Sequence, residues 1–169
     1  AILLMRERGI AHLAVKDTEG RVVAVARGMD LLRMQRQSPA MMRQEIRAAG
    51  SVEDLTDCRA RVVDLTRGLV AGGARPRSAV RLFSMASDLI VERLVDFALR
   101  DLGEPPSAFA FVALGSGGRR EPTPASDQDN AIVYAAPTEP DADKAHRYFV
   151  SLGEKVCRRL NEVGIAYCR

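Results

Sequence analysis

The sequence predicts a mixed α/β (α+β) protein built from three consecutive segments. Two short apolar runs separated by turn residues lie near the start, and apolar residues at spacings of three and four fill the middle. A strand, a glycine-rich turn, a second strand and a helix follow. The chain has 169 residues, 47% hydrophobic and 28% charged, which excludes disordered and fibrous classes. We therefore divide it into residues 1–37, 38–103 and 104–169.

Charge and hydropathy narrow the range of partners. The 25 basic and 22 acidic side chains leave a net charge of +3 and are spread evenly, so we expect no nucleic-acid surface, which needs clustered positive charge. The longest apolar run, residues 108–114, is far shorter than the roughly 20 residues that span a bilayer, so we expect no membrane contact and a cytoplasmic location. Cys58, Cys157 and Cys168 lack paired spacing, which argues against a zinc site or a disulfide framework.

The first segment predicts two strands and a helix. The strands cover residues 10–15 and 22–26 around a turn at 17–20, and the helix runs from Gly28 to about residue 36. The chain begins inside an apolar run and ends just after another, residues 165–167, so we expect these residues to be an internal part of a longer protein.

This segment resembles the second half of a CBS domain, a module that often binds adenine nucleotides. Because such modules often pair, the resemblance implies a homodimer formed through this region. The family usually has a Thr or Ser three residues before a ribose-binding Asp. Asp30 is present here, but Arg27 stands at the hydroxyl position, so we expect a structural remnant of a regulatory module. The resemblance is carried by residues 9–15, Asp17, Gly20, 22–25 and 30–32.

Capping residues and apolar spacing predict three helices over residues 38–103. Ser38 and Pro39 begin the first helix, and Ser51, with Asp54 three residues later, begins the second, which Gly72 ends. The apolar faces of the second helix and of a third over 78–102 predict an antiparallel bundle. These faces consist of Leu55, Cys58, Val62, Leu65 and Leu69, and of Leu82, Phe83, Met85, Ala86, Leu89, Ile90, Leu94 and Phe97.

The third segment predicts an α/β arrangement. We expect a buried strand over 108–114, a second strand over 127–134, a helix over 141–163 that Gly164 ends, and a third strand over 165–168. The residues of the helix that should face inward are Ala145, Tyr148, Phe149, Leu152, Val156, Leu160 and Val163.

A glycine-rich turn after the first of these strands suggests a phosphate site. It consists of Gly115, Ser116, Gly117 and Gly118, followed by Arg119 and Arg120. A Walker loop needs Gly-Lys before Ser or Thr, and the dinucleotide fingerprint needs glycine where Arg120 stands, so neither motif is present. Small residues let backbone amides approach phosphate oxygens, a short helical turn adds its positive end, and the arginines can neutralise a triphosphate or pyrophosphate.

Two aspartates at the start of the next strand suggest a metal site. Asp127 and Asp129 are two residues apart, so in a strand they share a face with α-carbons about 7 Å apart. Like charges this close repel unless a cation neutralises them, and magnesium typically takes one or two carboxylates and leaves its other positions to water and phosphates. The sequence therefore predicts a magnesium ion between these aspartates and the phosphate turn.

At these residues the chain resembles the nucleotidyltransferase superfamily. Within it, the chain is similar to the family found joined to CBS domains and related to the amino-terminal domain of the PII-protein uridylyltransferase. The resemblance implies transfer of a nucleoside monophosphate from a nucleoside triphosphate to an acceptor hydroxyl, with release of pyrophosphate, and we expect a signalling protein as the acceptor. The matching residues are Gly115, Ser116, Gly117, Gly118, Arg119, Arg120 and Glu121, and 126–134.

The resemblance also implies roles for these residues. Asp127 and Asp129 hold two magnesium ions, Ser116 and the turn backbone hold phosphate oxygens, and Arg119 or Arg120 offsets the charge of the leaving pyrophosphate. Glu121 orients an arginine. The superfamily normally adds a third carboxylate from a later strand, and none is found before residue 169, so we expect this stretch alone to be inactive.

Two alternatives share the same residues. The chain could be a regulatory module that senses a nucleotide without transferring it, for which the CBS resemblance is the argument. It could also be an enzyme that polymerises or tails nucleic acid, but the absence of a basic face argues against that.

Overall fold

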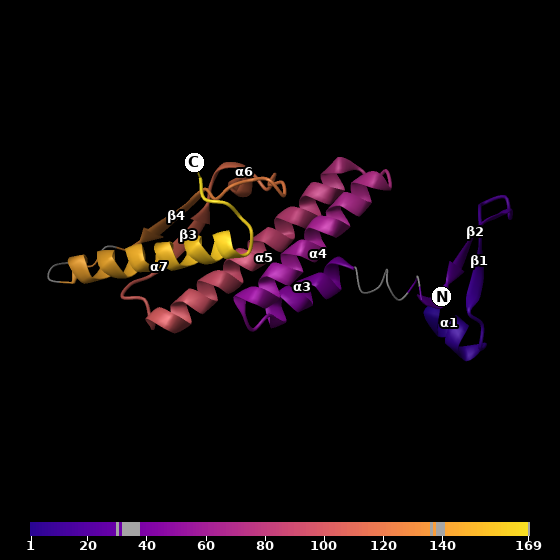
Figure 1. Ribbon diagram of the computed structural model, residues 1–169, viewed down its shortest axis with the longest axis horizontal. Coiled ribbons are helices and arrows are strands. Elements are labelled where there is room, and N and C mark those ends of the chain that lie inside the picture. The colour runs from indigo at the N-terminus through magenta and orange to yellow at the C-terminus, as the bar shows by residue number, and fades with distance from the viewer. Residues whose placement is uncertain (30, 32–37, 136, 138–140, 169) are drawn as a thin grey trace. The chain divides into compact units, whose positions relative to one another are not determined.

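Helices and two small antiparallel sheets make up the chain, as the sequence predicts for an α+β protein (Figure 1). The computed structural model describes residues 1–29, 31, 38–135, 137 and 141–168. The chain divides into two compact units, Ala1–Met42 and Arg43–Arg169. None of the described helices is both long and apolar enough to cross a membrane.

The first unit contains a β-hairpin. Strands β1 (His12–Lys16) and β2 (Val22–Arg27) pair antiparallel, and the Asp17 carboxylate closes the turn by accepting the N–H groups of Glu19 and Arg21, both at 2.9 Å. The predicted hairpin is confirmed. Helix α1 (Ile2–Glu7) was not predicted, because its six residues carry no side-chain cap and an apolar run this short does not distinguish helix from strand. The predicted helix after Gly28, with Asp30, lies mostly outside the described residues.

The helical segment begins with α3 (Pro39–Ala48), α4 (Val52–Ala71) and α5 (Pro76–Leu102). The predicted cap of α4 is confirmed: the Ser51 hydroxyl accepts the N–H of Asp54, and the Asp54 carboxylate accepts the N–H of Ser51, each at 3.1 Å. Helix α5 begins two residues before the predicted start, because Pro76 takes a first-turn position that needs no N–H donor.

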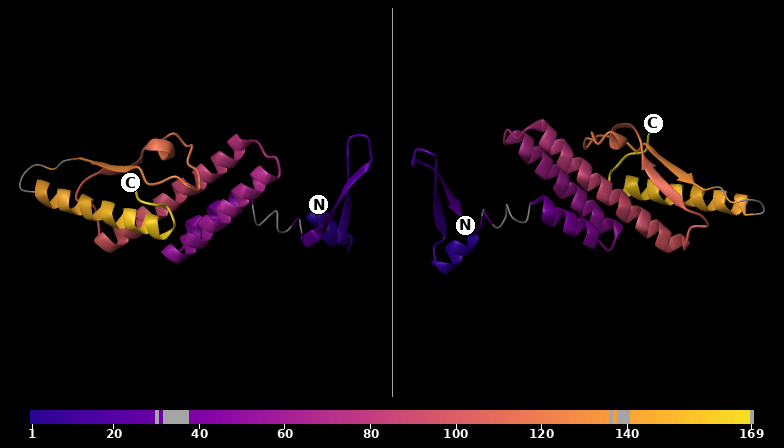
Figure 2. Two further views of the ribbon diagram at one scale, coloured as in Figure 1. Left: turned by 45° about the horizontal axis from the view of Figure 1, so that its top comes forward. Right: turned by 180° about the vertical axis from the view of Figure 1, so that it is seen from behind.

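The apolar faces of the helices form the core of the second unit. Helix α4 packs on α5, and α7 (Ala142–Glu162) contacts both α5 and strand β4 (Asn130–Tyr134) (Figure 2). The predicted inward residues of α5 and α7 are buried except Met85 and Tyr148, which are half-buried. In α4 the predicted stripe is only partly right, because Leu65 and Leu69 are half-buried, whereas Val63 and Thr66 are buried.

The second sheet positions the residues of the phosphate turn. Strands β3 (Phe109–Ala113) and β4 (Asn130–Tyr134) pair antiparallel, with α6 (Gly115–Gly118) directly after β3. The expected burial of the first strand is wrong: Ala110 and Ala113 are exposed and the rest of β3 is half-buried, because among the described residues this sheet has only two strands and α7 packs on one face.

Two of the predicted strand boundaries also need correction. Strand β4 begins at Asn130, so Asp127 and Asp129 precede the strand instead of lying in it. The predicted strand over 165–168 is reduced to one parallel bridge between Gln128 and Tyr167. The bridge places the segment after α7 beside Gln128, between the two aspartates and just before β4. Figure 1 shows this segment running back from the end of α7 toward the sheet.

Candidate functional site

The backbone places Asp129 against the start of the glycine-rich turn. The N–H of Leu114 donates to the carbonyl oxygen of Asp129 at 2.7 Å, which extends the pairing of β3 and β4 by one step. A β-carbon on Gly115 would meet the Asp129 carboxylate, and would lie 3.0 Å from its Cγ and 3.3 Å from its Cβ. Gly115 also has a φ of +51°, which side chains disfavour. Glycine is therefore required here for two independent reasons.

The rest of the turn folds back onto β3. A β-carbon on Gly118 would lie only 2.7 Å from the carbonyl oxygen of Ala113, so glycine is required there as well. The N–H groups of Gly115, Ser116 and Gly117 belong to the first turn of a helix, where no intrahelical carbonyl is available to accept them. The turn therefore lies close to the backbone of β3 and presents N–H groups that can donate hydrogen bonds to an anion.

Ser116 joins the turn to the loop that precedes the aspartates. Its hydroxyl donates to the Ser126 hydroxyl at 3.3 Å, and Ser126 in turn accepts the N–H of Thr123 at 2.9 Å. The N–H of Ser126 donates to the carbonyl oxygen of Thr123 at 3.0 Å, which closes the loop. The loop is thus joined to the predicted phosphate site by the hydrogen bond between Ser116 and Ser126, and two hydrogen bonds between Thr123 and Ser126 hold its own shape.

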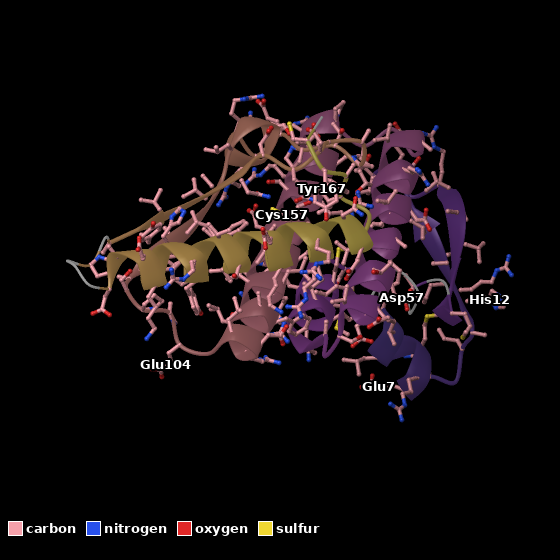
Figure 3. The ribbon with its side chains drawn as sticks, turned by 60° about the vertical axis from the view of Figure 1, so that its left-hand side comes forward. Glu7, His12, Asp57, Glu104, Cys157 and Tyr167 are labelled. Atoms are coloured by element: carbon pink, nitrogen blue, oxygen red, sulfur yellow. The ribbon has the colours of Figure 1, made fainter. Side chains whose placement is uncertain are left out.

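Gln128 determines which way the two aspartates face. Its side chain is buried, and its Nε2 donates to the carbonyl oxygens of Ile165 at 2.7 Å and Cys157 at 3.0 Å, while its N–H donates to Ala166 at 2.9 Å. Figure 3 labels Cys157 on α7 and Tyr167 in the segment that follows it. Since side chains alternate along an extended backbone, Asp127 and Asp129 point away from this buried side.

The two aspartates line a cleft together with residues from the helices. Ser116 and Gly117 of the turn, Thr123 and Ser126 of the loop, and Asn130 of β4 line the same cleft. The sequence had not indicated its helical wall, which includes Arg59 of α4 and Ser87 and Asp88 of α5. The one available signal was the presence of two polar residues, 87 and 88, within the apolar face of the third predicted helix.

The predicted arginines do not line this cleft. Arg119 is exposed, and its Nε donates to the Glu121 carboxylate at 3.3 Å. Arg120 has a φ of +57° and approaches the Asp88 carboxylate at 3.9 Å. Burial raises the pKa of Asp88, and the Arg120 charge opposes that rise. Both arginines therefore already have carboxylate partners.

The thiol of Cys168 lies near both aspartate side chains. The negative charge of Asp127 is the main cause that raises the pKa of this thiol, followed by burial, the charge of Asp129 and hydrogen bonds to both carboxylates. Both carboxylates thus face one exposed thiol. Within the described ranges, no three His, Cys, Asp or Glu side chains are arranged to hold a metal. The donor set suits a hard cation such as magnesium, which needs only one or two carboxylates.

Comparison with known proteins assigns the family. The model described as "Putative nucleotidyltransferase DUF294" matches residues 60–169, which is more than half of the chain and includes the glycine-rich turn and both aspartates. No curated protein and no solved structure matches the chain. By its sequence, and with a turn and an acidic pair that lie together in the fold, this chain belongs to the nucleotidyltransferase family DUF294.

Proposed function

We propose that this chain is a magnesium-dependent nucleotidyltransferase domain that transfers a nucleoside monophosphate from a nucleoside triphosphate to an acceptor hydroxyl. The acceptor oxygen forms a bond to the α-phosphorus, the bond from that phosphorus to the bridging oxygen of the β-phosphate breaks, pyrophosphate leaves, and the hydroxyl proton passes to solvent. The observation that carries the proposal is the fit of the Asp129 carboxylate against Gly115, which joins an acidic pair to a phosphate-type turn.

Asp127 and Asp129 are the proposed metal ligands and the catalytic carboxylates. Two magnesium ions, when bound there, would lower the pKa of the attacking hydroxyl and neutralise the triphosphate. The aspartates hold these positions because Gln128 is anchored to the backbone of Ile165 and Cys157. The two carboxylates repel each other in the absence of a cation, and this repulsion favours occupancy.

The turn is the proposed binding site for the phosphates. The N–H groups of Gly115, Ser116 and Gly117 are donors in the first turn of α6, and the Ser116 hydroxyl already lies at the cleft wall. Gly118 lets the turn fold close to β3. Arg119 and Arg120 add positive charge directly after the turn, which reduces the repulsion between the triphosphate and the acidic pair.

The finer assignments follow from the resemblance to the PII-protein uridylyltransferase. We propose a uridylyltransferase-like reaction with a signalling protein as acceptor, in the cytoplasm. We also propose that the first unit mediates homodimerisation, because its hairpin exposes apolar side chains: Val22, Val23 and Val25 are 58%, 60% and 60% exposed. The second candidate is a module that senses a nucleotide without transferring it. The superfamily normally adds a third carboxylate from a later strand, whereas among the described cleft residues the only carboxylate besides Asp127 and Asp129 belongs to Asp88 of α5, which precedes them in the chain.

Calorimetric titration with ATP and with UTP, each with and without magnesium, tests the proposal. We expect magnesium-dependent binding that the double variant Asp127→Asn, Asp129→Asn abolishes. The matched control, Asp57→Asn with Asp143→Asn, removes two exposed carboxylates outside the cleft and should bind as the unsubstituted chain does. Binding that is absent, or that survives the double substitution unchanged, would rule out the proposed site.

A further inference from the structure

Arg59 contributes a positive charge to the cleft from outside the glycine-rich motif. It belongs to α4 and lies one residue before the stretch that the family model matches. Its Nη2 donates to the carbonyl oxygen of Pro124 at 3.1 Å. On its other side, a β-carbon at Gly164 would lie 3.1 Å from Nη1 and 3.7 Å from Cζ. The guanidinium is thus held between the loop at Pro124 and the end of α7.

The charge of Arg59 has no counterion in the described part of the chain. No ion pair within the described ranges joins it to a carboxylate, whereas Arg119 pairs with Glu121 and Arg120 with Asp88. Burial lowers the pKa of Arg59. A half-buried cation without a partner is costly, because it loses hydration without gaining an ion pair.

Most N–H donors of Arg59 form no hydrogen bond within the described residues. A guanidinium has five N–H donors, and the hydrogen bond to Pro124 uses one of them. The same cleft carries Ser116, Gly117 and the aspartate pair. A planar cation with unused donors, next to hydroxyl and amide donors, is the arrangement that recognises phosphate oxygens in two-point contact.

We propose that Arg59 binds the terminal phosphates of the nucleotide, the part that leaves as pyrophosphate, from the helical wall of the cleft. This inference rests on the proposed function, because it assigns a ligand to the same site. It also gives α4 a direct part in the reaction: the side chain that holds the loop at Pro124 is the side chain that contacts the leaving group. Arg119 and Arg120 then have a secondary role, outside the cleft.

Charge and loop anchoring can be separated with two variants. Arg59→Gln removes the charge but retains an N–H donor for the Pro124 carbonyl, and Arg59→Lys retains the charge but loses the planar fork. Arg67→Gln is the matched control, because Arg67 is exposed on the same helix and pairs with Asp64. The probes are magnesium pyrophosphate and magnesium tripolyphosphate, titrated by calorimetry, with thermal unfolding recorded for each variant.

The proposal predicts a graded loss of affinity for both probes. Arg59→Gln should bind about 10- to 100-fold more weakly, as expected for a lost charge-assisted hydrogen bond, Arg59→Lys should lie in between, and Arg67→Gln should be unchanged. Equal affinity of Arg59→Gln and the unsubstituted chain would overturn the inference. So would equal losses in Arg59→Gln and Arg59→Lys, because the charge that the lysine retains would then contribute nothing to phosphate binding.

The outcomes also separate this inference from the proposed function. If pyrophosphate affinity is unaffected in Arg59→Gln but ATP binding is lost in the double aspartate variant, the proposed function stands and Arg59 is not the phosphate ligand. If the unsubstituted chain binds neither ATP nor pyrophosphate, both are wrong. If Arg59→Gln fails to fold, the comparison of Arg59→Lys with Arg67→Gln still decides, because unchanged pyrophosphate affinity in folded Arg59→Lys would contradict two-point recognition by the guanidinium.

Discussion

The carboxylate of Asp129 occupies the space that a side chain at position 115 would need. Gly115 and Asp129 are 14 positions apart in the chain, yet the hydrogen bond between Leu114 and Asp129 fixes them side by side. The phosphate turn and the acidic pair are thus parts of one rigid corner at the end of the β3–β4 hairpin. Substitutions at this corner should therefore affect stability and ligand binding together.

Gly115→Ala should destabilise the chain. The left-handed backbone alone costs about 1–2 kcal/mol for a residue with a β-carbon, and the methyl group must also displace the Asp129 carboxylate. Gly117→Ala is the control, because its β-carbon would make an ordinary 3.6 Å contact with the Ala113 side chain. Urea unfolding measures both, and equal unfolding free energies for the two variants would refute this reading of the turn.

Gln128→Leu should destabilise the chain by about 1–3 kcal/mol. The substitution leaves the carbonyl oxygens of Ile165 and Cys157 without the Nε2 donor that both now accept. Gln44→Leu, at an exposed position of α3, is the control and should lie within about 0.5 kcal/mol of the unsubstituted chain. Denaturant titration gives the comparison, and similar values for the two variants would show that Gln128 does not anchor the segment after α7.

Asp54 should make the stability of the chain depend on pH in the acid range. The N–H of Gly50, then the hydroxyl and N–H of Ser51, lower the pKa of Asp54 below its ordinary value of 3.8. A carboxyl group with a lowered pKa stabilises the folded state above its unfolded pKa. That stabilisation is lost as the pH falls through the folded value.

Asp54→Asn should remove this part of the pH dependence. Urea midpoints recorded between about pH 5 and pH 2 should therefore fall less steeply for Asp54→Asn than for the unsubstituted chain. Asp57→Asn, in the same helix but outside the cap, serves as the control. An acid dependence that is unchanged in Asp54→Asn would contradict the role of the capping box.

Cys168 should report on the two aspartates through its reactivity. Because Asp127 and Asp129 raise the pKa of the thiol, the double variant Asp127→Asn, Asp129→Asn should contain more thiolate at pH 8 and react faster with iodoacetamide. Peptide mass spectrometry distinguishes Cys168 from buried Cys58 and half-buried Cys157. A reaction rate that the double substitution leaves unchanged would mean that the carboxylates do not face this thiol.

The sequence predicted the features that depend only on residues close to one another in the chain. Ser51 and Asp54 are three residues apart and cap α4 as expected, and the apolar spacing of 145–163 identified the buried face of α7. The glycine-rich turn was predicted as a unit because its conformational requirements are specific to glycine. These predictions needed no knowledge of which elements pack together.

The predictions that failed depended on tertiary neighbours. The run over 108–114 is apolar enough for a buried strand, but how much of it is buried depends on how many strands and helices cover it. Arg59 and Asp88 enter the cleft from helices far away in the sequence. Asp88, with Ser87, interrupts an apolar helix face, but nothing near Arg59 in the sequence distinguishes it from a surface charge. Asp127 and Asp129 were predicted to share a face because they would lie in one strand, but both precede β4. They share the cleft because Gln128 between them is anchored on the opposite side.

The proposed function requires a metal and a phosphate to meet between the aspartate pair and the Gly-Ser turn. Paramagnetic broadening of amide signals by Mn²⁺, used in place of magnesium with ATP present, tests it most directly. We expect strong broadening at Gly115, Ser116, Gly117 and 127–130, and loss of this pattern in the double variant Asp127→Asn, Asp129→Asn. Broadening centred elsewhere, or an unchanged pattern in the double variant, would contradict it.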